Sequence, residues 1–141
     1  MNLPTAFSEP VLTHEPFTCF LVEDNPIIRQ NLIATLEEMV HLQVVGTAED
    51  EGSAVRWMHQ PQAHCDLMII DIFLKSGTGL EVLRQARQAL PGAHLVVLTN
   101  YATPDTRQRC AQLGADRVFD KSAELEELLG YCESLTGGHD A

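Results

Sequence analysis

The stretch DLMIIDIFLKSGTGLEVL, residues 66–83, decides the fold of this chain. It contains a continuous apolar run, residues 67–70, that ends at Asp71. An apolar run of this length followed by turn-forming residues is typical of a strand buried on both faces of a parallel sheet. A loop with two glycines comes next, and a helix follows in which Leu80, Leu83 and Leu90 share one stripe. The stretch therefore predicts the strand, loop and helix of an α/β fold.

Asp71 stands at the carboxyl end of this predicted strand, which is where open α/β sheets place their chemistry. A carboxylate there, above a glycine-containing loop, is suited to act as a nucleophile, as a metal ligand or as both. The alternative is that Asp71 only caps the loop, because aspartate favours turns. Residues 66–83 do not separate these two interpretations, so the rest of the chain has to decide.

Composition and charge narrow the class of protein. The 141 residues are 45% hydrophobic, which suits a single domain with a substantial core. The formal net charge of −11 predicts repulsion from nucleic-acid phosphates, so we expect no direct DNA or RNA binding. No apolar run approaches the ~20 residues of a membrane span, and the N-terminus does not resemble a secretion signal. The four cysteines lack metal-site or disulfide spacing, which favours reduced thiols in a cytoplasmic protein.

Five predicted strands alternate with five predicted helices. The strands are residues 17–22, 42–48, 67–70, 94–99 and 117–119. Asn25-Pro26 and Thr103-Pro104 are helix starts, an N-cap residue followed by proline, and we expect Ser122 to cap the last helix. The second helix is expected over residues 53–59. This alternation predicts a doubly wound five-stranded parallel sheet with flavodoxin-like strand order 2-1-3-4-5 and helices on both faces.

The ends of the chain are expected to lie outside this domain. Residues 1–16 contain three prolines among scattered polar residues, which predicts a flexible N-terminal arm. We expect the folded domain to span residues 17–135 and residues 136–141 to form a flexible C-terminal tail. Inside the domain, the helix between Thr103 and Gly114 is polar with few apolar anchors, so we expect it to be held loosely.

The predicted strand order gathers acidic residues at one edge of the sheet. Glu23 and Asp24 follow the first strand, and Asp71 follows the third strand, which is its neighbour in this order. Three carboxylates this close repel one another, and a divalent cation removes that cost. Mg²⁺ prefers hard oxygen ligands and keeps several of its waters, so the pattern predicts an open magnesium site.

Two further polar residues end the fourth and fifth strands, Thr99 and Lys121. With the metal in place, Asp71 can attack a phosphoryl group as a carboxylate nucleophile. Lys121 would bring positive charge to the phosphoryl oxygens, and Thr99 would bring a hydroxyl. For any one of these residues taken alone, a surface acidic cluster neutralised by Lys121 is a more common explanation than a phosphoryl site. Five suitable residues at the ends of four strands together favour the phosphoryl site.

Five motifs resemble the receiver domain of bacterial two-component response regulators, and the resemblance covers roughly residues 17–135. The motifs are FLVEDN at 20–25, LMIIDIFL at 67–74, GLEVL at 79–83, VVLTNYA at 96–102 and GADRVFDKS at 114–122. The resemblance implies that Asp71 is the phosphoacceptor. It also implies that Glu23, Asp24, Asp71 and the backbone carbonyl of Phe73 bind Mg²⁺, and that Thr99 and Lys121 contact the phosphoryl group.

A receiver of this kind would be a phosphoprotein of a two-component phosphorelay and a switch in signal transduction. It would accept its phosphoryl group from a sensor histidine kinase or a phosphotransfer protein, and would catalyse at most its own phosphorylation and dephosphorylation. We expect a downstream protein to bind the face made by the fourth helix, the fifth strand and the fifth helix. Residue 135 lies near the end of the sequence, so we expect a stand-alone receiver or the receiver portion of a longer protein.

The chain departs from the family pattern near the expected switch. Val118 stands three residues before Lys121, where the family usually carries an aromatic switch residue, so Tyr101 or Phe119 are candidate substitutes. Asn100 is larger than the alanine or glycine common at its position, and it is expected to crowd the approach of the phosphoryl group.

The loop after the phosphoacceptor and the rim of the site also depart from the pattern. Lys75 replaces a common proline, which predicts a more mobile loop. Phe73 and Tyr101 stand two residues after Asp71 and Thr99. Where other receivers have polar residues that position water, these aromatic side chains are expected to shield the site.

Two other classes of function fit the chain less well. An aspartyl-phosphate phosphatase typically carries a second aspartate two residues after its nucleophile, and this chain has Phe73 there. A degenerate receiver that serves as a protein-binding scaffold usually lacks an acidic residue or the lysine, and this chain has both.

Overall fold

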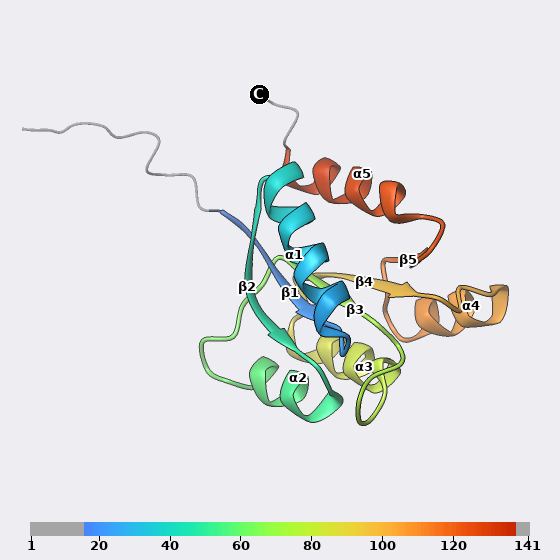
Figure 1. The fold of residues 1–141 in the computed structure, drawn as a ribbon. Helices are drawn as coiled ribbons and strands as arrows, with labels where there is room; N and C mark the ends of the chain where they lie inside the picture. The colour runs from blue at the N-terminus through green and yellow to red at the C-terminus, as the bar shows by residue number, and fades with distance from the viewer. Residues whose placement is uncertain (1–15, 138–141) are drawn as a thin grey trace, which may run out of the picture.

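Five parallel strands form one sheet in the order β2-β1-β3-β4-β5 (Figure 1). The computed structural model describes residues 16–137. The strands are β1 (Phe17–Val22), β2 (Leu42–Ala48), β3 (Leu67–Ile70), β4 (His94–Thr99) and β5 (Arg117–Asp120). Strand β3 lies at the centre, and all four of its residues are buried. The predicted strand order and doubly wound fold are therefore confirmed.

Helices cover both faces of this sheet. They are α1 (Pro26–Met39), α2 (Glu51–Met58), α3 (Gly79–Ala89), α4 (Pro104–Gln112) and α5 (Leu125–Thr136). Buried residues of α1 and α5 belong to one core cluster, and those of α2, α3 and α4 belong to the other. Figure 1 shows α1 and α5 on one side of the sheet and α2 and α3 on the opposite side.

The continuous apolar runs of the sequence are explained by these two cores. Side chains along a strand point alternately to the two faces of the sheet. In β3, Met68 and Ile70 pack into the core beneath α2 and α3, whereas Leu67 and Ile69 pack into the core beneath α1 and α5. A strand that is covered on both faces needs apolar residues at every position, which is why no polar alternation marks it.

The two helix starts predicted from an N-cap residue followed by proline are both present. The side chain of Asn25 accepts hydrogen bonds from the backbone nitrogens of Ile27 and Ile28, at 2.9 and 3.0 Å. The hydroxyl of Thr103 accepts one from the backbone nitrogen of Thr106 at 3.2 Å. The first of these caps starts α1 directly after the acidic residues that follow β1.

The start of α5 differs from the prediction, because Ser122 does not cap it. The N-cap residue is Glu124, and its side chain makes no cap hydrogen bond. Ser122 is instead held by Asp120, whose carboxylate accepts hydrogen bonds from the Ser122 nitrogen and hydroxyl, both at 2.8 Å. This local turn at the end of β5 moves the helix start to Leu125, because an aspartate side chain competes well for nearby backbone N–H groups.

The boundaries of two helices also differ from the prediction. Helix α2 begins at Glu51, because Asp50 accepts a hydrogen bond from the backbone nitrogen of Ser53 at 2.8 Å. Met39 is 65% exposed, so Leu32, Leu36 and Val40 carry the buried face of the α1 region. Helix α5 continues to Thr136. Apart from Pro16 and residues 136–137, the expected arm and tail lie outside the described residues. Among residues 16–137, no helix is long and apolar enough to cross a membrane.

Candidate functional site

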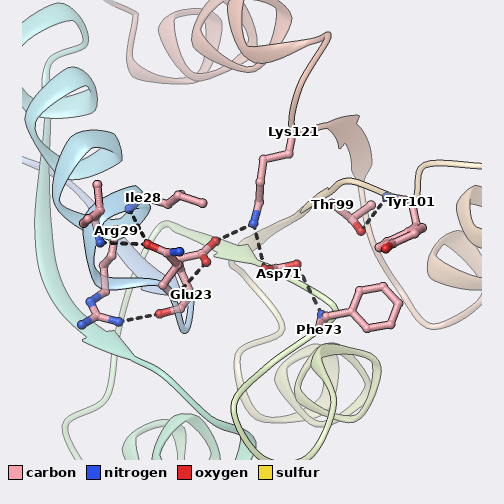
Figure 2. A network of polar contacts seen from close by, with 10 residues as sticks. Glu23, Ile28, Arg29, Asp71, Phe73, Thr99, Tyr101 and Lys121 are labelled. Carbon is pink, nitrogen blue, oxygen red and sulfur yellow. Dashed lines mark hydrogen bonds and ion pairs between the residues drawn. The ribbon is translucent and has the colours of Figure 1, made fainter.

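The acidic residues predicted to meet at the sheet edge do meet there (Figure 2). Each of Glu23, Asp24 and Asp71 offers a carboxylate oxygen, and these atoms all lie within 4.8 Å of one another. Glu23 and Asp71 follow the paired residues Val22 and Ile70 of neighbouring strands. The backbone nitrogen of Asp71 also donates to the carbonyl of Val22 at 2.9 Å, which continues the ladder to the phosphoacceptor candidate.

The carboxylates of Glu23 and Asp71 are largely removed from solvent. These residues are only 2% and 7% exposed. Burial raises the pKa of Glu23, although hydrogen bonds from Lys121 and from the backbone nitrogen of Asn25 act against this rise. A buried carboxylate requires partners, and Lys121 is the charged partner that both residues share.

Lys121 reaches across the site from the end of β5. Its Nζ atom lies 2.9 Å from Glu23 Oε1 and 2.8 Å from Asp71 Oδ2. Burial lowers the pKa of Lys121, but its hydrogen bonds to Asp71 and Glu23 outweigh burial and leave the pKa raised. The backbone nitrogen of Lys121 donates to the carbonyl of Thr99 at 2.8 Å, so β4 also fixes its position. The predicted juxtaposition of Lys121 with the carboxylates is thus present.

The charges of the cluster suit a divalent metal ion. When ionised, three carboxylates and one ammonium group leave an excess of two negative charges. The carboxylate oxygens are hard ligands of the kind that Mg²⁺, Mn²⁺ and Ca²⁺ bind. Asp24 is only partly buried, which leaves the cluster open on one side for water ligands. The donor set therefore fits a hydrated divalent cation.

Arg29 is a residue at this site that the sequence interpretation missed. Its Nη1 atom donates to the backbone carbonyl of Glu23 at 2.7 Å, as Figure 2 shows. The side chain comes from the first turns of α1 and folds back on the loop that carries Glu23 and Asp24. A basic residue six positions after Glu23 on a helix is the only available sequence signal, and it does not reveal a backbone partner.

Thr99 is fully buried at the end of β4, beside an exposed aromatic residue. Its hydroxyl oxygen accepts a hydrogen bond from the backbone nitrogen of Tyr101 at 3.1 Å. Within the described residues, this is the hydrogen bond that the Thr99 hydroxyl makes. Because a hydroxyl can accept one hydrogen bond while it donates another, Thr99 can keep this bond and still donate its hydroxyl hydrogen to an acceptor in the site.

Phe73 and Tyr101 form a pair of rings beside Asp71. The ring centroids are 4.9 Å apart, and the planes meet at 65° in an edge-on arrangement. The two residues are 57% and 60% exposed, and in Figure 2 they lie on the side of Asp71 opposite Glu23. The backbone nitrogen of Phe73 donates to Asp71 Oδ1 at 3.3 Å. The rings thus line the open side of the site away from the predicted metal position.

The remaining switch and access candidates lie in different surroundings. Val118 is half-buried, and Phe119 is only 2% exposed because it packs into the core beneath α1 and α5. Asn100 is exposed and, together with Lys121, lines a cavity of about 330 Å³ between α1 and the start of α5. Of the two aromatic candidates for a switch, Tyr101 is therefore the one with room to move.

The loop after Asp71 is tied down despite its two glycines. Glu51 of α2 donates its backbone nitrogen to the Ser76 carbonyl at 3.0 Å and accepts from the Thr78 nitrogen at 3.0 Å. Gly77 has a φ of +76°, which favours glycine. Gly79 packs so closely on the backbone of Asp71 that a side chain there would collide with it. These contacts fix the backbone of the loop that follows Asp71 at Ser76, Thr78 and Gly79.

Comparison with known proteins places the chain in one family. The family model of the response regulator receiver domain matches residues 19–133. Among curated proteins, the DNA-binding transcriptional activator DevR/DosR of Mycobacterium tuberculosis is 28% identical over 119 residues, which are 84% of this chain and 54% of that protein. The response regulator UvrY of Escherichia coli is 25% identical over 118 residues, which are 84% of this chain and 53% of that protein. The chain spans about half the length of the curated relatives it matches.

Solved structures agree with the family match. A two-component response regulator of the LuxR family from Aurantimonas has a TM-score of 0.76 and 26% identity, over 88% of this chain and 87% of that chain. A CheY-like receiver domain protein from Methanospirillum hungatei has the same TM-score at 22% identity, over 88% of this chain and 96% of that chain. Since the family model covers most of the sequence and the strand order agrees, this chain belongs to the response regulator receiver domain family.

Proposed function

We propose that this chain is a phosphorylation-controlled signalling switch in which Asp71 accepts the phosphoryl group. The observation that carries the proposal is the pair of hydrogen bonds from Lys121 to Glu23 and Asp71 inside a cluster of three carboxylates. A lysine and a metal-binding acidic cluster around one nucleophilic carboxylate are what phosphoryl transfer requires. The scaffold alternative lacks comparable support, because neither the acidic residues nor the lysine are missing.

The roles of the residues follow from their contacts. Asp71 would form the new bond to phosphorus through one carboxylate oxygen while the bond between phosphorus and the donor breaks. Lys121 would remain paired with Glu23 and hold its ammonium group against the phosphoryl oxygens. Thr99 would donate its hydroxyl hydrogen to a phosphoryl oxygen while its oxygen continues to accept from the Tyr101 backbone nitrogen. These roles need no base in the protein, because an ionised carboxylate is already nucleophilic.

We assign Mg²⁺ as the metal of the acidic cluster. Glu23, Asp24 and Asp71 would hold it with the backbone carbonyl of Phe73, and it would supply positive charge to the phosphoryl oxygens. Solved receivers with 22% identity to this chain include one with a phosphorylated aspartate and a calcium ion and one in a Mn²⁺-bound form. The preference for Mg²⁺ rests on the small number of protein ligands and the open side of the cluster, which suit an ion that keeps several of its waters.

The partners belong to the same proposal. A sensor histidine kinase or a phosphotransfer protein would donate the phosphoryl group, and a downstream protein would bind the face made by α4, β5 and α5. The relative DevR/DosR is a DNA-binding protein, but this chain matches only about half of it and carries a net charge of −11. We therefore propose that these 141 residues do not bind nucleic acid. Four buried free cysteines support a cytoplasmic location.

The chain would act as a switch and not as an enzyme on other substrates. It would catalyse at most its own phosphorylation and dephosphorylation, because the nucleophile Asp71 is itself the acceptor. The folded unit of this switch would include residues 17–136, because α5 continues one residue beyond the predicted end of the domain.

Intact-protein mass measurement after incubation with acetyl phosphate tests the proposed function. Wild type with Mg²⁺ should gain one acid-labile phosphoryl group, and chelation of the metal should prevent the gain. Asp71→Asn and Asp24→Ala should gain none or almost none, whereas the exposed control Asp105→Asn should behave as wild type. Phosphorylation of Asp71→Asn at the wild-type rate would show that the assignment of the phosphoacceptor is wrong.

A further inference from the structure

Helix α4 has little apolar contact with the rest of the protein. Cys110 is the one buried residue among Pro104–Gln112. A helix that buries so little apolar surface depends on polar contacts for its position. The contacts that hold α4 are therefore the place to look for control of its movement.

Arg107 supplies these contacts from the second turn of α4. Its Nε atom donates to the carbonyl of Ala102 at 3.0 Å, and Nη1 donates to the carbonyl of Val118 at 2.8 Å. Its Nη2 atom donates to Glu124 Oε1 at 2.9 Å. One guanidinium group thus joins the loop before α4, the middle of β5 and the start of α5.

Glu124 extends the same network to the backbone beside Lys121. Its Oε1 atom also accepts a hydrogen bond from the backbone nitrogen of Asp120 at 2.7 Å. The side chain is therefore bound to β5 and to Arg107, which explains why it makes no cap hydrogen bond at the start of α5. This pair of side chains holds the backbone at Val118 and Asp120, shortly before the lysine whose side chain binds Asp71.

This hydrogen-bond network includes Val118, the position at which the chain lacks the aromatic switch residue that is usual in the family. Val118 has no aromatic ring that could swing between exposed and buried positions, but its carbonyl is held by Arg107. Thr99 lies opposite Asp120 in the β4–β5 ladder, so the held segment of β5 is also the one that pairs with Thr99. If this segment of β5 moves at Lys121 or Thr99, the guanidinium group of Arg107 would transmit the movement directly to α4.

We propose that Arg107 and Glu124 are positioning residues that couple helix α4 to the phosphorylation site in this chain. The inference rests on the proposed function of Asp71. In the unphosphorylated protein the pair holds α4 against β5 and fixes the backbone that carries Lys121. Phosphorylation changes what Lys121 and Thr99 bind, and the pair transmits that change to α4. Without the pair, α4 is released whether or not Asp71 is modified.

Amide hydrogen exchange with and without beryllofluoride, a phosphoryl mimic that needs Mg²⁺ and Asp71, tests this coupling. In wild type, beryllofluoride should change the exchange of residues 104–112. In Arg107→Gln, exchange of that segment should be about tenfold faster without beryllofluoride and should no longer respond to it. Arg107→Lys keeps the charge but not the planar fork, so it should restore only part of the response.

Three comparisons make the outcome decisive. Arg109→Gln removes the same charge from an exposed position of α4 and should behave as wild type. Glu124→Gln keeps Arg107 but weakens the pair, and it should show the same loss of response as Arg107→Gln. Amide hydrogen exchange of β3 should be unchanged in both variants. If Arg107→Gln alters the exchange of β3, the response of α4 in Glu124→Gln becomes the test of the coupling. A wild-type response of α4 in Arg107→Gln or Glu124→Gln, with exchange of β3 unchanged, would overturn the coupling.

The same experiment separates this inference from the proposed function. If wild-type protein binds no beryllofluoride and gains no phosphoryl group at Asp71, the proposed function fails. If wild type binds the mimic and the Arg107 and Glu124 variants bind it and respond like wild type, only the coupling fails. Phosphorylation by acetyl phosphate should also slow in Arg107→Gln without a change in the concentration of acetyl phosphate that gives the half-maximal rate, because Lys121 is less firmly placed.

Discussion

Phe73 and Tyr101 are the residues that decide how water would reach a phosphoryl group on Asp71. Their rings contact each other at the open side of the site, opposite Glu23. Neither side chain carries a carboxylate that could orient water as a base, and both are apolar over most of their surface. The sequence predicted this shielding from their positions two residues after Asp71 and Thr99, and the structure adds the ring contact.

We therefore predict a long-lived phosphorylated state. After removal of the donor, Phe73→Asn combined with Tyr101→Glu should lose its phosphoryl group about tenfold faster than wild type, because polar groups then admit and position water. The measurement is the decay of phosphorylated protein in intact mass spectra. Leu125→Asn, a change of another exposed apolar residue, serves as control. Equal decay of the double variant and wild type would mean that the rings only form a partner surface.

Arg29 should affect the metal without touching it. Its bond to the Glu23 carbonyl fixes the loop that presents Glu23 and Asp24. Residues that orient metal ligands typically change metal affinity by about 10- to 100-fold when they are removed. We predict a loss of this size for Mg²⁺ binding by Arg29→Gln and a smaller loss for Arg29→Lys, measured by titration calorimetry. Arg56→Gln, on the exposed face of α2, should leave the affinity unchanged, and an equally unchanged Arg29→Gln would remove Arg29 from the site.

The site residues differ in how well they could be predicted from the sequence. Glu23, Asp71, Thr99 and Lys121 could be placed together because each ends or follows a strand, and the strand order fixes which strand ends are neighbours. Arg29 and Arg107 were not predicted, because their partners include the backbone carbonyls of Glu23 and Val118. A carbonyl is present at every position, so only the side-chain conformation in the folded protein shows which one is bound.

At the scale of elements, aspartates in the segments between a strand and the next helix decide where the helix begins. Asp50 and Asp120 bind backbone nitrogens ahead of them, and each moves a helix start away from its predicted place. The sequence offered several candidate caps within a few residues in both loops. The residue that caps the helix depends on the turn that the backbone makes, and a single sequence does not specify that turn. The existence and type of the elements followed more securely from apolar runs and from the Asn25 and Thr103 caps.

Asp66 joins the starts of two neighbouring strands and should stabilise the sheet. Its Oδ2 atom accepts from the backbone nitrogen of Thr18 at 2.8 Å, while its own nitrogen donates to the Thr18 hydroxyl at 3.1 Å. Asp66→Ala would leave the half-buried Thr18 nitrogen without its partner. We predict a loss of about 1 kcal/mol in the free energy of unfolding, measured by urea denaturation. Phosphorylation should stay normal, because this end of the sheet lies opposite the site. A stability within error of wild type would contradict this role.

At the scale of the whole molecule, the sheet is packed between two hydrophobic cores, and the four cysteines lie in these cores. Burial raises the pKa of Cys65 to about 12, with a smaller contribution from the charge of Asp66. Burial also raises the pKa of Cys132 to about 12. Both thiols are therefore expected to stay protonated and unreactive in the folded protein at neutral pH. The sequence predicted reduced thiols from their spacing, and in the structure all four cysteines are free and buried.

These thiols make the fold sensitive to alkaline pH. Their folded pKa exceeds the unfolded value of 9.0, so their contribution to stability is complete below pH 9 and is lost as the pH rises toward 12. We predict that each thiol accounts for a decrease of roughly 2 kcal/mol in the free energy of unfolding at a pH of about 10.5 relative to about 8. Cys132→Val should show a smaller decrease than wild type in urea denaturation at the two pH values. Identical decreases would exclude this thiol as a cause.

The central claim is that the sheet edge of this receiver directs a phosphoryl group to one carboxylate, that of Asp71. Borohydride trapping tests it most directly, because reduction converts an aspartyl phosphate into homoserine at the modified position. Wild type should be treated with acetyl phosphate and Mg²⁺, reduced, digested and sequenced by mass spectrometry. We predict homoserine at position 71 and its loss when the metal is chelated. Homoserine at another carboxylate, or at position 71 regardless of the metal, would contradict it.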